Sequence, residues 1–204
     1  MLIKTLPVGQ LETNCYIVTD EESRKCVIID PGAESGTILD YIESNNLTPE
    51  LIFLTHGHFD HTMALEAVVE ATGAPVYINK PDASIGRHNI PKSFGDAGKL
   101  RLYSEGDKLT SGNLEFTVLE TPGHSPGSVT LMCENALFTG DTLFRDGCGR
   151  TDLDGGDTNT LLSSLKRLSD LEGDFEVYPG HADSSTLSRE RSFNHYMRYA
   201  NGER

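Results

Sequence analysis

The feature of this chain that most constrains its fold is a short run of histidines and aspartates after an apolar stretch. Residues 55–61 read Thr-His-Gly-His-Phe-Asp-His, so three of the seven histidines in the whole sequence fall within six residues. Three other motifs, at 122–125, 139–142 and 179–181, each place a histidine or an aspartate directly after a glycine. Imidazole and carboxylate groups are ligands of divalent cations. The candidate ligands are His56, His58, Asp60, His61, His124, Asp141 and His181.

The spacing within residues 56–61 favours two cation sites over one. In an extended run, residues two apart point the same way, so we expect His56 and His58 to bind a common ion. As the chain turns into a helix, Asp60 and His61 point elsewhere and can bind a second ion about 3.5 to 4 Å away. The alternative is that Asp60 only caps a helix beside incidental histidines, but a cap accounts for one residue of the four.

The other three candidates are weaker when each is taken alone. An isolated histidine is more often a hydrogen-bonded structural residue than a ligand, and Asp141 alone is typical of a turn. Their setting favours ligation, because His124 and His181 each follow Pro-Gly and Asp141 follows an apolar run. At the exit of such a strand, Asp141 can be presented as a bridge between two ions. His88 and His195 match no motif and receive no role.

Strand and helix patterns alternate at both ends of the chain, around a β-rich middle. Short apolar runs predict a hairpin from residues 16–18 and 26–29, and amphipathic spacing predicts helices at 36–46, 63–72, 159–171 and 187–199. Further strands are expected at 51–54, 76–78 and 175–178, with an antiparallel region formed by 99–103, 114–119, 129–133 and 136–139. No linker divides the chain, so we predict an α+β fold of one domain, residues 1–204, with two packed sheets and helices outside. Residues 79–98 are predicted to form a loop. The sequence does not determine whether this loop covers the site as a lid.

Charge and cysteine content exclude several classes of protein. Lys and Arg total 17 against 31 Asp and Glu, and the formal net charge of -14 repels nucleic-acid backbones and anionic membranes. Four cysteines without a CxxC pair indicate free thiols in a reducing cytosol, and Cys148 lies in a glycine-rich loop. The sequence has no secretory signal and no apolar run of about 20 residues. We therefore expect a soluble, cytoplasmic protein with no nucleic-acid or membrane partner.

The order of the motifs resembles the metallo-β-lactamase superfamily. HxHxDH, TPGHS, FTGDT and YPGH run from residue 56 to 181, and with the strands at 16–18 and 27–32 the resemblance spans nearly the whole chain. It implies a four-layer αββα sandwich with a dinuclear metal site at the edge between the two sheets. The family pattern assigns His56, His58 and His124 to one metal, Asp60, His61 and His181 to the other, and Asp141 to both. It also implies that Asp30 steadies a ligand loop.

Within this superfamily, residues 146–152 and 178–194 resemble the short glyoxalase II-like proteins, which are hydroxyacylglutathione hydrolases. That resemblance implies a thioesterase acting on a glutathione or related thioester, with a metal-bridging hydroxide as nucleophile and Asp60 as the catalytic residue that handles its proton. The chain departs from the usual glyoxalase II, because Arg150 is followed by Thr151 and Asp152. We also expect no separate C-terminal helical domain. Arg150 is expected either to meet a substrate carboxylate or to pair with a local aspartate.

Other activities use the same ligands. Persulfide dioxygenases resemble this chain in the same loop and fold, and that reading places a single iron at His56, His124 and Asp141. Lactone hydrolysis is a further alternative. Hydrolysis of β-lactams is disfavoured, because the sequence has no export signal. A non-catalytic metal-binding protein is also disfavoured, because structural metal sites are usually closed. The ligands accept zinc, iron or manganese, and we expect two divalent ions, with zinc first. The expected partner is a small-molecule thioester, and the sequence does not determine the oligomeric state.

Overall fold

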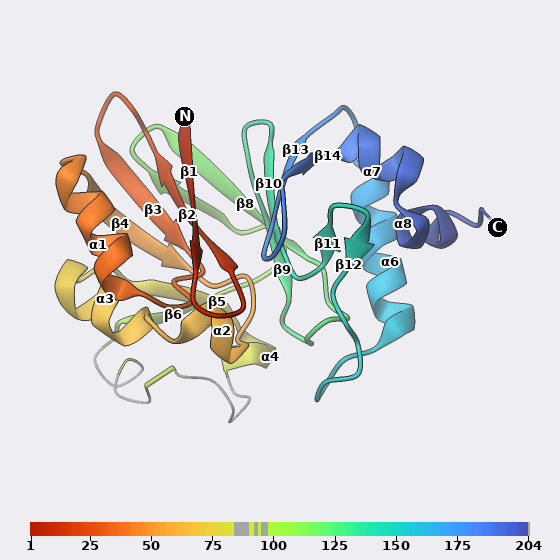
Figure 1. The fold of residues 1–204 in the computed structure, drawn as a ribbon, viewed down its shortest axis with the longest axis horizontal. Helices are drawn as coiled ribbons and strands as arrows, with labels where there is room; N and C mark the ends of the chain where they lie inside the picture. The colour runs from red at the N-terminus through yellow and green to blue at the C-terminus, as the bar shows by residue number, and fades with distance from the viewer. Residues whose placement is uncertain (84–89, 92–93, 95–97, 204) are drawn as a thin grey trace.

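The computed structural model describes residues 1–83, 90, 91, 94 and 98–203. In this described part, two six-stranded sheets lie face to face and helices cover both outer faces (Figure 1). The predicted αββα sandwich of the α+β class is confirmed. No helix in the described ranges is both long and apolar enough to cross a membrane.

The first sheet joins an antiparallel meander to parallel strands. Its order is β1-β2-β3-β4-β5-β6, with antiparallel pairing as far as β3 and parallel pairing beyond it. Its strands are β1 (Leu2–Val8), β2 (Thr13–Thr19), β3 (Lys25–Ile29), β4 (Thr48–Phe53), β5 (Val76–Asn79) and β6 (Leu100–Tyr103). The helices of this half are α1 (Ser35–Ser44), α2 (Phe59–Thr62), α3 (Leu65–Thr72) and α4 (Lys80–Ala83).

The second sheet is mostly antiparallel. Its order is β14-β13-β10-β9-β8-β7, and only β10 and β13 pair in parallel. Its strands are β7 (Lys108–Ser111), β8 (Leu114–Glu120), β9 (Val129–Cys133), β10 (Ala136–Gly140), β13 (Glu176–Pro179) and β14 (Ser185–Thr186). A ribbon of β11 (Leu143–Phe144) and β12 (Gly147–Cys148) and the helices α6 (Thr158–Ser169), α7 (Leu187–Phe193) and α8 (His195–Ala200) complete this half.

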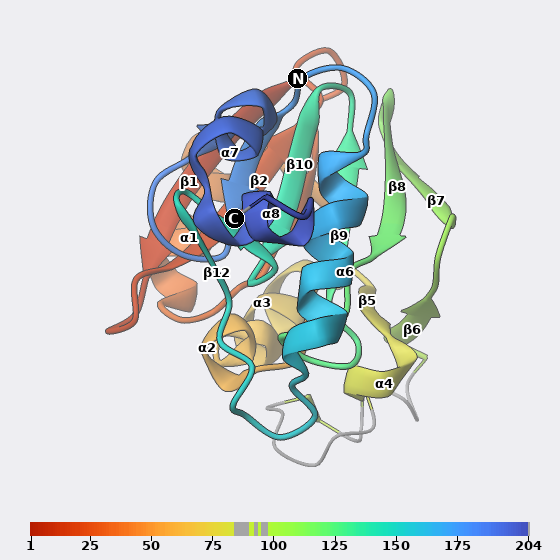
Figure 2. The same cartoon turned by 90° about the vertical axis from the view of Figure 1, so that its right-hand side faces the viewer.

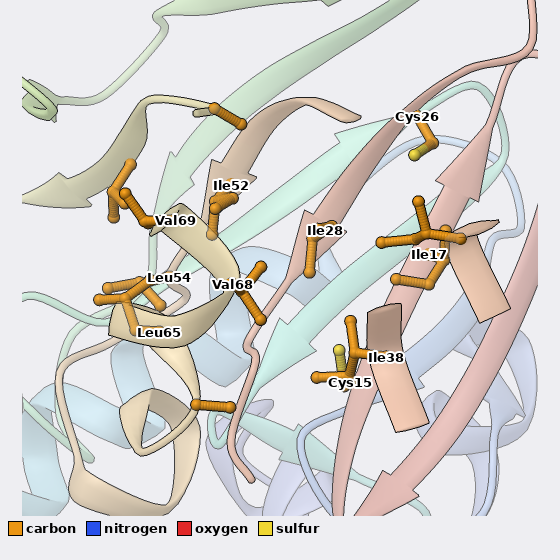
Figure 3. Close-up of a cluster of buried hydrophobic side chains, with 14 of the residues drawn as sticks. Cys15, Ile17, Cys26, Ile28, Ile38, Ile52, Leu54, Leu65, Val68 and Val69 are labelled. Carbon is orange, nitrogen blue, oxygen red and sulfur yellow. The ribbon is translucent and has the colours of Figure 1, made fainter. Parts of the chain in front are cut away.

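Strand β2 shows how the first sheet contributes to two cores. All seven of its residues are buried, and successive side chains point to opposite faces. Cys15 and Ile17 pack under α1 and α3, in the cluster drawn in Figure 3. Tyr16 and Val18 instead face the second sheet. A strand that is covered on both faces reads as a continuous apolar run, which is why its sequence does not alternate between apolar and polar residues.

The core between the sheets is built around Phe53, the last residue of β4. Its ring centroid lies 5.8 Å from that of Tyr77 and 6.3 Å from that of Tyr103, both in the first sheet. It also lies 5.3 Å from the centroid of Phe116 in the second sheet, in an edge-on arrangement. Edge-on pairs add a modest attraction to the burial of apolar surface. Phe53 therefore joins the two sheets just before the chain reaches Thr55 and the histidines.

The outer helix α6 confirms the helix predicted at residues 159–171, with its start one residue earlier. The carboxylate of Asp157 caps it by accepting a hydrogen bond from the Thr160 backbone N–H at 2.7 Å. Leu161, Leu165 and Leu168 are its buried leucines, and the helix lies across β9 and β10 in Figure 2. The one-face spacing of these leucines is what made the helix readable in the sequence.

Several strands differ from the sequence prediction, and the short strands β11, β12 and β14 were not expected. Residues 100–103 were assigned to the antiparallel region, but β6 pairs in parallel with β5 at the edge of the first sheet. That assignment was wrong, because local apolar content does not reveal which neighbour a strand pairs with. The edge strands β1 and β7 were not predicted at all. In β1 the exposed positions alternate only at Leu2 and Lys4, and the next exposed residue is Pro7, so its sequence lacks a sustained period-two signal.

Two further segments contain more elements of secondary structure than predicted. The helix expected at 187–199 is two helices, because Asn194 takes an extended backbone conformation and its side chain accepts hydrogen bonds from the Tyr196 and Met197 N–H groups. Asn194 therefore ends α7 and caps the N-terminus of α8. Of the loop predicted at 79–98, residues 80–83 form α4, while 84–89, 92, 93 and 95–97 lie outside the described residues.

The position of Phe53 makes a prediction about stability. Replacing it with alanine removes a fully buried ring from the core between the sheets and leaves a cavity, so the free energy of unfolding should fall by about 3 to 5 kcal/mol. Urea denaturation followed by circular dichroism would measure this. Leu102→Ala is the control, since Leu102 is 52% exposed and its loss should change the free energy by less than about 0.5 kcal/mol. Equal effects of the two substitutions would contradict this account of the core.

Candidate metal centre

Four loops deliver the candidate ligands to one edge of the sandwich. The first follows β4, the second precedes β9, and the other two follow β10 and β13. Because β10 and β13 are parallel, their carboxyl ends lie side by side, which places Asp141 beside His181. The backbone N–H of Val129 in the second sheet donates to the carbonyl of Thr55 in the first, at 2.9 Å. This hydrogen bond joins the two sheets at the edge where the ligands meet.

Two glycines explain why the motifs contain that residue. Gly140 has a φ of +47°, and a Cβ atom there would lie 2.4 Å from Thr55 Oγ1. A Cβ atom on Gly180 would lie 2.2 Å from Asp141 Oδ1. Any other residue would clash at either position, and Gly140 also has a conformation that side chains disfavour. The absence of a side chain at each position lets the loops approach closely enough for their ligands to meet.

The seven predicted ligands lie together. Three groups have ligand atoms within 4.8 Å of one another: His56 with His58 and His124, His56 with His61 and Asp141, and Asp60 with His61 and His181. Asp141 lies between the histidines of both ends, with carboxylate oxygens 3.4, 3.5 and 3.6 Å from Nε2 of His61, His124 and His181. The structure thus brings together every candidate ligand that the sequence singled out. That these side chains bind metal stays a prediction.

Asp30 orients two of the histidines from outside the cluster. Its Oδ2 atom lies 2.9 Å from His61 Nδ1 and accepts a hydrogen bond from the Thr55 hydroxyl at 2.6 Å. The same hydroxyl lies 3.1 Å from His56 Nδ1, and the Thr55 backbone N–H donates to Asp30 Oδ1 at 2.8 Å. With both Nδ1 atoms engaged, Nε2 of His56 and of His61 is the nitrogen left to face the cluster. The expected role of Asp30 in steadying a ligand loop agrees with these contacts.

Backbone carbonyls orient two more histidines. His124 Nδ1 lies 2.7 Å from the carbonyl oxygen of Arg150, and His181 Nδ1 lies 3.0 Å from that of Leu11. A carbonyl only accepts, so each Nδ1 carries a proton and each Nε2 is the nitrogen directed at the cluster. Arg150 therefore contributes to the site through its backbone, a role that sequence reasoning missed because any residue supplies a carbonyl.

The electrostatics of the cluster favour the metal-binding protonation states of His58 and Asp60. Burial and the neighbouring His124 lower the pKa of His58 to about 4, so its imidazole is neutral at neutral pH. Burial raises the pKa of Asp60, but its hydrogen bond with His181 and the charge of His61 outweigh burial and lower it to about 2. Neutral imidazoles and ionised carboxylates are the metal-binding forms. Burial likewise lowers the pKa of His61, yet Asp141 and Asp30 raise it well above its usual value, which shows that the carboxylates favour a positive charge here.

Three buried atoms of the cluster have no hydrogen-bond partner in the described part of the chain. They are Nε2 of His56, Nε2 of His61 and Oδ1 of Asp141. Native proteins rarely leave buried polar atoms unpaired, because each loses its hydration without compensation. All three belong to residues of one candidate group, which a divalent cation would satisfy at once. The donor set therefore fits a metal centre.

A cavity of about 710 Å³ opens over the cluster. Besides candidate ligands it is lined by Leu11, Phe59, Ser125, Phe144, Cys148, Arg150, Leu153 and Asp154. Burial raises the pKa of the Cys148 thiol to about 11, which favours its protonated form. The guanidinium of Arg150 forms an ion pair with Asp152, as one of the two sequence expectations held.

Asp82 is a residue of the site that sequence reasoning missed. It is fully buried in α4 and accepts hydrogen bonds from the N–H groups of Gly57 and Gly127, at 2.8 and 2.7 Å, and from the Ser125 hydroxyl at 2.8 Å. One carboxylate thus ties together the loops that carry His58 and His124. Its sequence setting, a lone aspartate in a loop-like segment, contains no signal for this, because the partners lie far along the chain.

The sequence model of one protein family, the Metallo-beta-lactamase superfamily, matches residues 8–181 of this chain. The chain belongs to this superfamily. It is 37% identical over 205 residues to the probable metallo-hydrolase YqgX of Bacillus subtilis, with 95% of this chain and 96% of that protein covered. It is 30% identical over 209 residues to the hydroxyacylglutathione hydrolase GloC of Haemophilus influenzae, with 97% and 98% covered.

Solved structures of the superfamily share this fold along nearly the whole chain. The B3 metallo-beta-lactamase BLEG-1 has a TM-score of 0.84 and 34% identity, with 96% of this chain and 99% of that chain covered. ETHE1 from Myxococcus xanthus has a TM-score of 0.84 and 32% identity, covering 98% and 85%. TTHA1623 in a di-iron-bound form has a TM-score of 0.82 and 36% identity, covering 95% and 99%. These relatives carry different names on one fold, so the fold alone does not determine the reaction.

The contacts of Asp82 predict its effect on metal binding. Asp82→Ala should leave the Gly57 and Gly127 N–H groups unpaired and loosen both loops, weakening divalent metal affinity by about 10- to 100-fold. Competition with a chelator of known affinity, followed by metal analysis, would measure this. Asp82→Asn should lose less, because its amide oxygen still accepts.

Asp107→Ala is the matched control for Asp82. Asp107 also accepts a backbone hydrogen bond, from Ser104 at 2.9 Å, but in an exposed turn that does not contact the ligand loops. Its replacement should leave metal affinity unchanged. Unaltered affinity in Asp82→Ala would contradict the positioning role.

Proposed function

We propose that this protein is a metal-dependent hydrolase, and specifically a thioesterase of the glyoxalase II type. The observation that carries the proposal is the convergence of unpaired atoms of His56, His61 and Asp141 beneath an open cavity. Structural metal sites are closed by protein ligands, whereas catalytic sites leave a position open to substrate. The likeness to a hydroxyacylglutathione hydrolase over nearly the full length supports the choice of reaction.

The proposed ligand assignment follows the family pattern. His56, His58 and His124 would hold one ion, and Asp60, His61 and His181 the other, with Asp141 shared. When bound, two dications lower the pKa of a shared water and polarise a substrate carbonyl. We propose zinc, and the same nitrogen and oxygen ligands accept iron or manganese.

Asp60 is the proposed catalytic residue. Its Oδ2 atom lies 3.2 Å from His181 Nε2 and 3.4 Å from the Thr13 hydroxyl, and its side chain lines the cavity. With its pKa lowered to about 2, the carboxylate is ionised at neutral pH and can accept a hydrogen bond from the attacking water and orient it. A thioester suits this arrangement, since a thiolate is a good leaving group and needs little help from an acid.

A second candidate function is persulfide dioxygenation with a single iron held by His56, His124 and Asp141. The structural likeness to ETHE1, at 32% identity, fits this alternative. In the structure, Asp141 Oδ2 lies 3.5 Å from His124 Nε2. Lactone hydrolysis is the third candidate, because it uses the same ligands. We retain as proposals a small-molecule partner, a cytoplasmic location and a single domain spanning residues 1–204.

Metal content and oxygen uptake separate the first two functions. We expect about two divalent ions per chain, hydrolysis of thioesters from a panel that includes S-lactoylglutathione, and no oxygen uptake with glutathione persulfide. Elemental analysis, a thiol-release assay and an oxygen electrode would measure these. One iron per chain with persulfide-dependent oxygen consumption would contradict the hydrolase. Faster cleavage of a lactone or a β-lactam than of every thioester would contradict the thioesterase.

Asp60→Asn tests the catalytic role of that carboxylate. The amide keeps an oxygen for metal binding but is a far weaker proton acceptor, so kcat should fall by about 100-fold or more while much of the metal is retained. Asp183→Asn is the charge-matched control, since Asp183 pairs with Arg145 at 3.2 Å and does not line the cavity. Full activity in Asp60→Asn would show that the assigned role is wrong.

A further inference from the structure

The walls of the active-site cavity are mainly apolar. Away from the candidate ligands, Leu11, Phe59, Phe144 and Leu153 line it, and the side chains of Leu11 and Phe59 are 54% and 52% exposed. Arg150 is the only lysine or arginine among the described residues that line this cavity. Away from the metal centre, a substrate carboxylate bound there would find no other lysine or arginine among the described lining residues.

That guanidinium already has a carboxylate partner. Nε and Nη2 of Arg150 each donate to one oxygen of Asp152, both at 2.6 Å, in a two-pronged ion pair. Such paired contacts are the strongest geometry that an arginine and a carboxylate form. Because Asp152 is two residues along the chain, it acts as an intramolecular competitor for any carboxylate that arrives from solution.

The loop that carries this ion pair is held in place at several points. The Arg150 carbonyl accepts from His124, the hydroxyls of Thr151 and Thr158 lie 2.7 Å apart, and the Asp157 N–H donates to the Gly123 carbonyl at 2.8 Å. The base of the Arg150 side chain is thus fixed beside the metal centre. Its guanidinium already donates through Nε and Nη2 to Asp152, so a carboxylate offsets its charge before any substrate arrives.

Two other arginines, Arg145 and Arg189, also form ion pairs with carboxylates of this chain. Arg145 lies 3.2 Å from the carboxylate of Asp183, and Arg189 lies within 2.9 Å of carboxylate oxygens of Asp146 and Glu190. Neither lines the cavity. The net charge of -14 further disfavours the approach of anions.

We propose, on the basis of the thioesterase function above, that this cavity takes thioesters without a carboxylate, and that Asp152 sets this preference by occupying the guanidinium of Arg150. The thiol part of the substrate would then be uncharged and would contact the apolar wall. Glutathione, which carries two carboxylates, would be a poor thiol carrier here. Asp152 is thus a specificity-determining residue that acts through Arg150.

Binding and turnover test this inference separately. The probes for binding are S-methylglutathione and N-acetyl-S-methylcysteamine, which have no thioester and are measured by calorimetry with the metal-loaded protein. The probes for turnover are the S-lactoyl thioesters of glutathione and of N-acetylcysteamine, which share one acyl group. We expect the wild type to favour the uncharged member of each pair by about two- to fivefold, the range of one exposed ion pair. Asp152→Asn should tighten S-methylglutathione binding by about two- to fivefold.

Matched variants separate the local effect from the change in net charge. Asp170→Asn removes one negative charge from an exposed pair with Lys166 at 2.5 Å, which does not line the cavity, and should leave binding of both probes unchanged. Adding Arg150→Gln to Asp152→Asn should abolish the gain. A wild-type preference for the glutathione compounds, or equal gains in Asp152→Asn and Asp170→Asn, would overturn the inference. Failure to cleave any thioester, with the expected binding pattern, would overturn the thioesterase and leave the binding preference standing.

Discussion

The candidate site depends on hydrogen bonds made by the ring nitrogens that face away from it. Asp30 and Thr55 hold His61 and His56, and the carbonyls of Arg150 and Leu11 hold His124 and His181. Each bond fixes a ring orientation and leaves the opposite nitrogen facing the same small volume. Without these partners the imidazoles could turn or change tautomer, and their lone pairs would not converge.

The same hydrogen bonds connect the site to the layers of the fold. Asp30 directly follows β3, Thr55 lies after β4, and Leu11 lies between β1 and β2, so three loops of the first sheet contribute. Arg150 comes from the second half of the chain, after β12. Because the supporting groups come from both halves, the site requires the sandwich to be assembled. Asp82 adds a further connection, between the loop after β4 and the loop before β9.

The candidate site has two parts, the cluster of candidate ligands and the remaining wall of the cavity. The ligands lie on loops whose glycines allow close approach, so few changes are tolerated there. The rest of the cavity wall includes Leu11, Phe59, Leu153 and Arg150, which are not candidate ligands. Relatives that share the fold at 30 to 37% identity carry different names.

Much of this molecule could be read from its sequence, because some signals are local. The histidine motifs, the glycines beside them and the leucine spacing of α6 predicted the superfamily, the αββα sandwich and the seven residues that the structure brings together. Other features depend on residues far apart in the chain and carry no local signal. The parallel pairing of β6, the three hydrogen bonds of Asp82 and the carbonyl of Arg150 beneath His124 are of this kind.

The sequence by itself therefore determined which side chains can bind cations and the family of folds that gathers them. Only the tertiary structure decided how they are oriented and whether Arg150 faces a substrate or Asp152. The physical reason is that ligand type and helical or strand spacing are properties of short segments. Ring orientation, ion-pair choice and strand neighbours are instead set by contacts that exist only when distant segments have packed together.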